Sequence, residues 1–267
     1  MDTLTLVILA CLAIGAVVGV MAGLLGIGGG LIIVPALTYL LADVMQVPPT
    51  ETIVIAIATS LSTIIFTGIS SARAHYRLGN LNRDILLWCG VGIGVGAIVG
   101  ATLASHLPGS VLKGIFAGLV MAIASYMLFG RQVTSNNEIS SQKLGVIGFG
   151  TGTLSAIMGI GGGALLVPAL VWYRVNIRQA IGSAAFSGII IAIFGSVSFA
   201  VSGWHYSHLS DGYLGYVYWP ATLSIAATSV FTAPLGARLG QRLNTQRLKK
   251  VFAVFLVIVS IRMLWGL

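Results

Sequence analysis

The sequence predicts an all-α polytopic membrane protein, and three observations carry this prediction. Of the 267 residues, 57% are hydrophobic and only 7% are charged, whereas a soluble domain carries about 25% charged residues. The mean hydropathy is +1.01. Long apolar runs reach the roughly 20 residues that a helix needs to cross a bilayer. The 35 glycines suit a membrane bundle, in which small residues let helix backbones approach closely.

The apolar runs follow one another with short gaps between them. They cover about 4–41, 52–72, 85–105, 111–130, 143–173, 179–202, 217–237 and 247–266. The first and fifth runs are too long for one spanning helix, and a glycine cluster interrupts each of them. The polar stretch 131–142 reads as a linker between a first membrane repeat, 1–130, and a second membrane repeat, 143–267.

The two halves repeat one another in sequence. Gly26–Leu37 reads Gly-Ile-Gly-Gly-Gly-Leu-Ile-Ile-Val-Pro-Ala-Leu, and Gly159–Leu170 reads Gly-Ile-Gly-Gly-Gly-Ala-Leu-Leu-Val-Pro-Ala-Leu. The next apolar runs also correspond, because Ala56–Ser60 matches Ala180–Ala184. Self-similarity of this kind predicts two copies of one unit of four apolar segments, produced by duplication.

The distribution of lysine and arginine predicts how these units cross the membrane. If all the runs cross fully, the basic residues divide almost evenly between the two sides. If the first and fifth runs turn back at their glycine clusters, every basic residue except Lys113 and Arg262 collects on one side, as cytoplasmic loops require. Each unit then makes three net crossings. We therefore expect two inverted repeats in a bacterial cytoplasmic (inner) membrane, with both termini in the periplasm.

The glycine clusters are the candidate substrate site. Non-helical backbone at membrane depth is tolerated only where it is buried in protein or lines a cavity. The first amides of a restarting helix have no internal partner and lie at the positive end of its dipole. We therefore expect an anion to be bound by backbone amides of Gly28, Gly29, Gly30, Gly161, Gly162 and Gly163. The alternative is that these glycines only permit tight helix crossing, the role expected of the pairs Gly96/Gly100 and Gly114/Gly118.

Hydroxyl groups in the following apolar runs are further candidate donors. Thr59, Ser60 and Ser183 could contact the anion, although hydroxyls in helices also bond their own backbone carbonyls. The six acidic residues all lie in loops or at segment ends, so no carboxylate relay is expected at membrane depth.

Other ligand classes are expected to be absent. No metal or cofactor is expected, because His205, His208 and Asp211 fit an interfacial polar belt better than a metal site. The net charge of +8 does not indicate nucleic-acid binding, because the basic residues occupy short gaps between apolar runs.

The paired glycine-proline segments, one opening each half, resemble those of the TauE/SafE family of sulfite exporters and toluene-sulfonate uptake permeases. The resemblance covers essentially the whole chain and includes Ala56–Ser60. It implies transport of sulfite, thiosulfate or an organosulfonate. The second half departs from this pattern, because Ser183-Ala184 replaces the Thr-Ser pair of the first half.

Three other kinds of protein remain as alternatives. An enzyme would need a nucleophile and base, or a metal cluster, at membrane depth, and the sequence shows neither. A non-transporting assembly subunit would not need two broken helices. An anion channel of other specificity would use the same site as a carrier.

Overall fold

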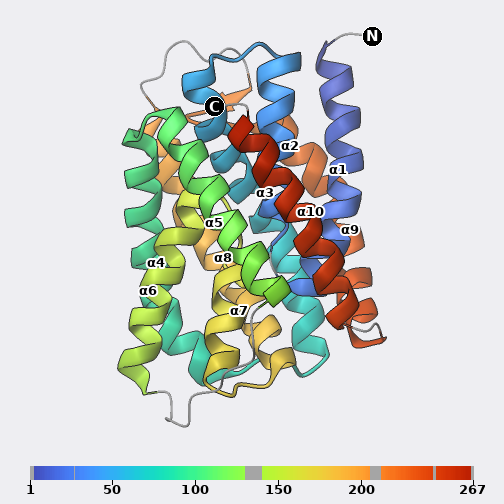
Figure 1. Cartoon of the computed structure of the whole chain (residues 1–267), viewed down its shortest axis with the longest axis vertical. Helices are drawn as coiled ribbons and strands as arrows, with labels where there is room; N and C mark the ends of the chain where they lie inside the picture. Colours follow the sequence, from blue (N-terminus) through green and yellow to red (C-terminus); the bar gives the residue numbers. More distant parts are fainter. Residues whose placement is uncertain (1–2, 27, 130–139, 205–211, 243–244, 266–267) are drawn as a thin grey trace.

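The computed structural model describes residues 3–26, 28–129, 140–204, 212–242 and 245–265, which are helical apart from short loops and one hairpin (Figure 1). The helices are α1 (Thr3–Leu25), α2 (Gly30–Tyr39), α3 (Pro49–Arg77), α4 (Arg83–His106), α5 (Gly109–Phe129), α6 (Ser141–Met158), α7 (Gly163–Trp172), α8 (Ile177–Ser202), α9 (Trp219–Arg242) and α10 (Thr245–Trp265). A π-helical turn, η1 (Leu40–Val44), continues α2. Strands β1 (Tyr213–Leu214) and β2 (Val217–Tyr218) form the antiparallel hairpin. Residues 130–139, which include most of the expected linker, lie outside the described part of the chain.

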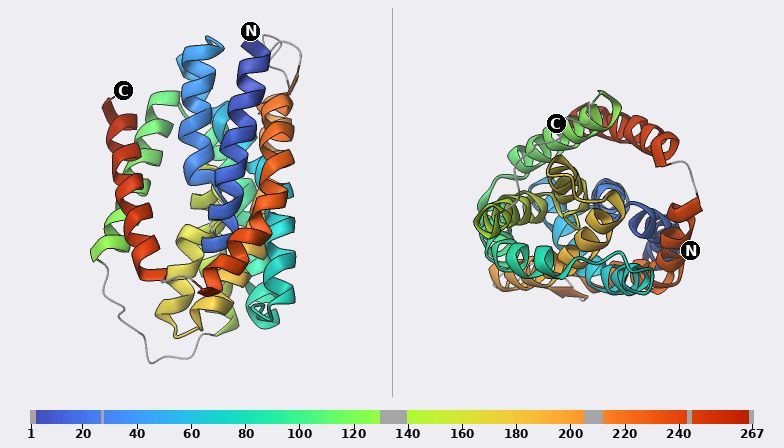
Figure 2. Two further views of the ribbon diagram at one scale, coloured as in Figure 1. Left: turned by 90° about the vertical axis from the view of Figure 1, so that its right-hand side faces the viewer. Right: turned by 90° about the horizontal axis from the view of Figure 1, so that it is seen from below.

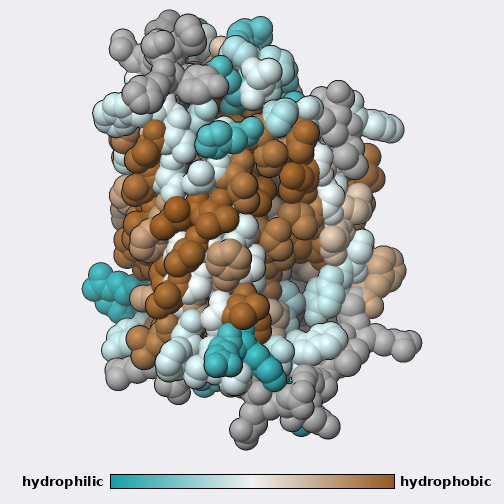
Figure 3. All heavy atoms as spheres, turned by 90° about the vertical axis from the view of Figure 1, so that its left-hand side faces the viewer, coloured by the Kyte–Doolittle hydropathy of each residue, from teal (hydrophilic) through white to brown (hydrophobic). Residues whose placement is uncertain are grey.

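Five of the described helices are long and apolar enough to cross a membrane: α1, α3, α4, α5 and α8. Large apolar side chains are exposed on the outside of the bundle, as expected of a lipid-facing surface: Val91 on α4 is 75% exposed and Phe231 on α9 is 77% exposed. Figure 3 shows apolar side chains in a broad band on one face, with hydrophilic residues gathered toward its two ends. The prediction of an all-α polytopic membrane protein is confirmed.

The first and fifth apolar runs each consist of two helices with a break between them. α1 ends at Leu25 and α2 begins at Gly30, while α6 ends at Met158 and α7 begins at Gly163. The residues just before the restarting helices have left-handed backbone, with φ of 78° at Gly29 and 76° at Gly162. Side chains disfavour this conformation, which glycine adopts freely. The glycine clusters therefore end one helix and allow the next to restart in a new direction.

Both broken segments turn back toward the end from which they came (Figures 1 and 2). α1 runs from the N-terminal end of the bundle to its middle, and α2 returns to that end. α6 and α7 do the same from the opposite end. The two termini lie at one end of the bundle.

The helices pack in pairs that correspond between the two halves. α1 packs along α9 and α6 along α4, while α3 packs against α8 and α5 against α10. Glycines let the first two pairs approach closely, because a Cβ on Gly19 would overlap the Ser229 carbonyl oxygen and one on Gly96 would overlap that of Phe149.

The helices differ sharply in burial. The most apolar stretch of α3 is 83% buried, whereas that of α1 is 28% buried. The core therefore lies around α3. On α5, a Cβ on Gly114 or Gly118 would meet nothing within 4 Å. The expectation that this pair serves a helix crossing is wrong, because no neighbouring backbone lies opposite it among the described residues.

Candidate substrate site

The two helix breaks meet in the middle of the bundle. A Cβ on Gly28 would lie 2.8 Å from the Gly161 Cα atom, closer than real Cβ contacts allow. A Cβ on Gly30 would overlap the Gly159 carbonyl oxygen. The breaks are therefore in direct backbone contact, and a larger residue at either position would push them apart.

The restarting helices leave this contact in opposite directions, so both present their N-terminal ends to it (Figure 1). In α7, the first described amide that donates to a backbone carbonyl is that of Leu165, which lies 3.1 Å from Gly162 O. In α2, the amide of Ile32 donates to Gly29 O over 3.0 Å. The amides before these in each first turn have no partner within their own helix. Two positive dipole ends therefore converge on one region, an arrangement that favours an anion.

A small cavity of about 10 Å³ lies where the breaks meet. It has room for about one water molecule. Its lining is formed by Ala22, Gly26, Gly28, Ile64, Gly68, Ser71, Gly161, Ala185 and Gly188. The Ser71 hydroxyl is buried in this lining and has no hydrogen-bond partner among the described residues. No motif in the sequence pointed to Ser71, although it lies on the same face of α3 as Ile64 and Gly68, at helical spacing.

The structure places the three predicted hydroxyls in different surroundings. Ser60 Oγ donates to the carbonyl oxygen of Gly159 over 2.8 Å, so it holds the second break in place. Thr59 Oγ1 accepts a hydrogen bond from the Tyr218 amide over 3.0 Å. Ser183 is fully buried, and its hydroxyl has no partner among the described residues. The lining of the small cavity includes none of the three.

The cavity lining is electrically neutral. It contains glycine, alanine, isoleucine and serine, with no charged side chain among the described residues. Two acidic residues lie outside this lining. Asp43 is exposed in η1, and Glu51 lies in the first turn of α3. His205, His208 and Asp211 lie outside the described residues. Backbone amides and hydroxyls are therefore the groups available to an anion here.

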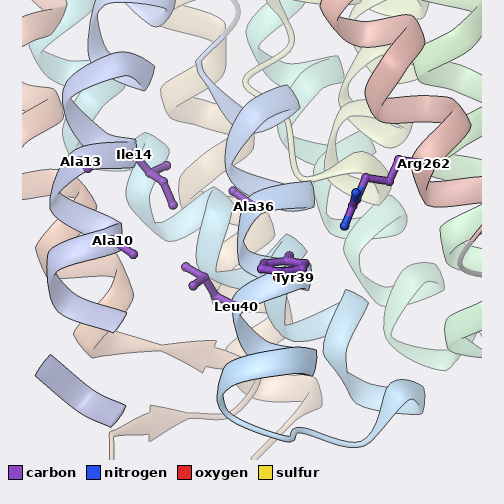
Figure 4. A pocket seen from close by; sticks show the side chains of 7 residues that line it. All are labelled: Ala10, Ala13, Ile14, Ala36, Tyr39, Leu40 and Arg262. Atoms are coloured by element: carbon purple, nitrogen blue, oxygen red, sulfur yellow. The ribbon is translucent and has the colours of Figure 1, made fainter. Parts of the chain in front are cut away.

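A larger groove of about 560 Å³ lies away from the breaks, between α1, α2 and α10 (Figure 4). Its lining is formed by Ala10, Ala13, Ile14, Ala36, Tyr39, Leu40 and Arg262. The Arg262 guanidinium carbon lies 5.8 Å from the centre of the Tyr39 ring, a cation–π contact. An adjoining pocket of about 210 Å³ brings Lys113 into the same region. The groove is mostly apolar and contains none of the glycines of the breaks, so it is not the candidate substrate site.

Comparison with known proteins agrees with a transporter architecture. A probable membrane transporter protein of Haemophilus influenzae is 42% identical over 261 residues, which cover 96% of this chain and 97% of that protein. A probable membrane transporter protein of Methanocaldococcus jannaschii is 26% identical, covering 94% of this chain and 93% of that protein. The probable membrane transporter protein YunE of Bacillus subtilis is 28% identical, covering 94% of this chain and 95% of that protein. No solved structure matches the chain.

The match to a protein family spans nearly the whole sequence. The profile described as "Sulfite exporter TauE/SafE" matches residues 11–263, which include both glycine clusters and every described helix in whole or in part. The resemblance stated from the motifs is therefore confirmed, and the chain belongs to the TauE/SafE sulfite exporter family of membrane proteins.

Proposed function

We propose that this protein is a permease that carries a small sulfur-containing anion, such as sulfite, thiosulfate or an organosulfonate, across the bacterial cytoplasmic membrane. The observation that carries the proposal is the contact between two broken helices at Gly28 and Gly161, with two helix N-termini directed toward it. Inverted-repeat transporters bind substrates at broken helices of this kind. The family description supplies the class of anion.

The proposed binding groups are the backbone amides of residues 28–30 and 161–163, with Thr59, Ser60 and Ser183 in support. Planar or tetrahedral oxyanions spread their charge over several acceptors, which suits several neutral donors. A helix end contributes about 0.3–1 kcal/mol to binding a charge at exposed positions and up to about 2 kcal/mol when partly buried. Two such ends give weak, reversible binding, which a carrier needs in order to release its substrate.

The described conformation is closed around this site. A cavity with room for one water molecule cannot hold an anion of four or more heavy atoms. Binding therefore requires the two breaks to separate. Because α2 leads to one end of the bundle and α7 to the other, movement of each broken segment would open the site toward a different side of the membrane. This is the geometry that alternating access needs.

We further propose that the halves 1–130 and 143–267 are inverted repeats, with both termini in the periplasm. The corresponding helix pairs and the opposite directions of the two broken segments support this arrangement. Single cysteines at Arg77 and Arg174, introduced after replacement of the buried Cys11 and Cys89, should both label from the cytoplasmic side of the membrane. The measurement is labelling of intact cells by a membrane-impermeant maleimide, with permeabilised cells as the control. Labelling of the two positions from opposite sides would rule out the inverted arrangement.

The neutral cavity predicts that transport does not depend on a buried carboxylate. Replacing each acid in turn by its amide, at Asp2, Asp43, Glu51, Asp84, Glu138 and Asp211, should leave at least half of the wild-type flux. The reason is that a carboxylate relay would have to lie at membrane depth, where the described lining contains no acid. Flux is measured in proteoliposomes at matched protein levels. Complete loss of flux in one well-inserted variant would contradict the prediction.

A flux assay tests the proposed function itself. Purified protein in proteoliposomes is given sulfite, thiosulfate and benzenesulfonate in turn, with and without proton and sodium gradients. We expect saturable uptake of at least one of them, and exchange of labelled for unlabelled anion across the membrane. A channel would give uptake of labelled anion that unlabelled anion inside the vesicles does not accelerate, and an assembly subunit would give no flux. Absence of flux for every sulfur anion would refute the proposal.

A further inference from the structure

A buried histidine joins the end of the first broken helix to α3. His75 is only 4% exposed and lies in the last turn of α3. Its Nε2 atom lies 3.0 Å from the carbonyl oxygen of Gly23, just before the first break. Its Nδ1 atom lies 3.4 Å from the side-chain amide nitrogen of Asn80. His75 is therefore the titratable contact between α1, α3 and the loop that follows α3.

These two contacts define one protonation state of the ring. An amide nitrogen can only donate, so Nδ1 accepts from Asn80. A carbonyl oxygen can only accept, so the Nε2–H group donates to Gly23. The ring is then neutral in this conformation. A proton added at Nδ1 would face the amide nitrogen of Asn80, and the contact would persist only if the amide turned to present its oxygen.

His75 lies one helical turn from the near edge of the cavity and about 16 Å along α3 from Ile64, the residue beside Gly28. Ser71, whose unpartnered hydroxyl lines the small cavity, is one helical turn before His75 on α3, about 6 Å along the helix axis. Gly68 and Ile64 continue the same face toward the contact of Gly28 with Gly161. A positive charge on His75 would therefore act on an anion at the breaks across about 16 Å of buried interior, where charges are screened less than in water.

The charged residues on the elements packed around His75 are mostly basic. α1 contributes none between Gly19 and Leu25. The others are Arg73 and Arg77 on α3 itself, Arg178 in the first turn of α8 and Arg238 near the end of α9. In sequence, Arg83 and Asp84 follow the loop of Asn80 at the start of α4, and Arg242 ends α9. An added positive charge on His75 is disfavoured in these surroundings, and an anion in the cavity would offset that cost.

We propose that His75 is the proton-binding site of this transporter, and that a proton on His75 and an anion at the Gly28–Gly161 contact favour each other's binding. The inference rests on the proposed function and adds the coupling ion to it. Coupling between two sites is reciprocal, so protonation raises the affinity for the anion and the anion promotes protonation. Protonation also disturbs the contact with Asn80 in the loop after α3, while the Nε2–H group still donates to Gly23 on the broken helix α1.

The test measures thiosulfate uptake into proteoliposomes between pH 5.5 and 8, because the charge of thiosulfate does not change over this range. In the wild type we expect the half-saturating concentration to rise fivefold or more as the pH rises. In His75→Gln it should not depend on pH, since glutamine can keep a donor on Gly23 but does not titrate. Asp84→Asn is the matched control and should keep the wild-type pH dependence. Each protein is first compared with the wild type by size-exclusion chromatography.

A second variant keeps the inference testable if His75→Gln does not fold. Asn80→Asp places a carboxylate beside Nδ1, so it should move the midpoint of the pH dependence to higher pH. The same pH dependence in wild type, His75→Gln and Asn80→Asp would overturn the assignment of His75 and leave the proposed function intact. No thiosulfate flux from the wild type at any pH would refute thiosulfate transport and the His75 assignment with it.

Discussion

Gly162→Val should abolish flux of sulfur anions, and Gly29→Val should do the same, while both proteins still insert into the membrane. Both glycines have left-handed backbone, with φ of 76° and 78°. A non-glycine residue held there costs about 1–3 kcal/mol, and a β-branched residue is especially unfavourable. Space is also short, because a Cβ on Gly162 would lie 2.6 Å from Ile191 Cδ1 and one on Gly29 would overlap a Val18 side-chain carbon, so these side chains would have to move.

The expected loss of flux follows from the position of these residues. Each is the last residue before a restarting helix, so a change in its backbone redirects the amides proposed to bind the anion. Gly114→Val is the matched control, since a Cβ there meets nothing within 4 Å and its φ is not positive. Flux is measured per inserted protein. Wild-type rates in both Gly29→Val and Gly162→Val would mean that the clusters serve packing only.

The sequence predicted the broken segments because the signal there is local. A run of glycines inside an apolar segment longer than one membrane span predicts that the helix is broken there. The same run occurs in both halves, which strengthens the prediction. The helix packing was less predictable. Gly96 and Gly114 each open the same small-residue pattern, yet only Gly96 faces a neighbouring backbone. The pattern shows where a close approach is possible and does not show whether a helix lies opposite.

The hydroxyl contacts could not be predicted, since their partners lie far away in the sequence. Thr59 accepts from Tyr218, and Ser60 donates across the repeat to Gly159. The repeat itself gave no guide to the second contact, because Ala184 stands where the first half has Ser60. Ser71 was missed for a related reason: a serine in an apolar helix looks like any other until a cavity is found beside it.

Three serines that look alike in sequence should respond differently to alanine. Ser60→Ala should lower the free energy of unfolding by about 1–3 kcal/mol, because it leaves the buried Gly159 carbonyl without its donor. Ser71→Ala and Ser183→Ala should change stability by less than about 0.5 kcal/mol, since neither hydroxyl has a partner among the described residues. Thermal unfolding of the purified proteins in detergent measures this difference.

The same variants should also differ in their transport kinetics. If Ser71 and Ser183 donate to the anion when the breaks part, loss of either hydroxyl removes about 1 kcal/mol of binding, which raises the half-saturating concentration about fivefold. Ser60→Ala should mainly reduce the maximal rate, because the second break loses the contact that fixes its position. Uptake measured over a range of thiosulfate concentrations distinguishes the two effects. If Ser71→Ala and Ser183→Ala both keep the wild-type half-saturation, the anion is bound without these two hydroxyls, and the backbone amides at the two breaks, with Thr59 and Ser60, are left as its proposed donors.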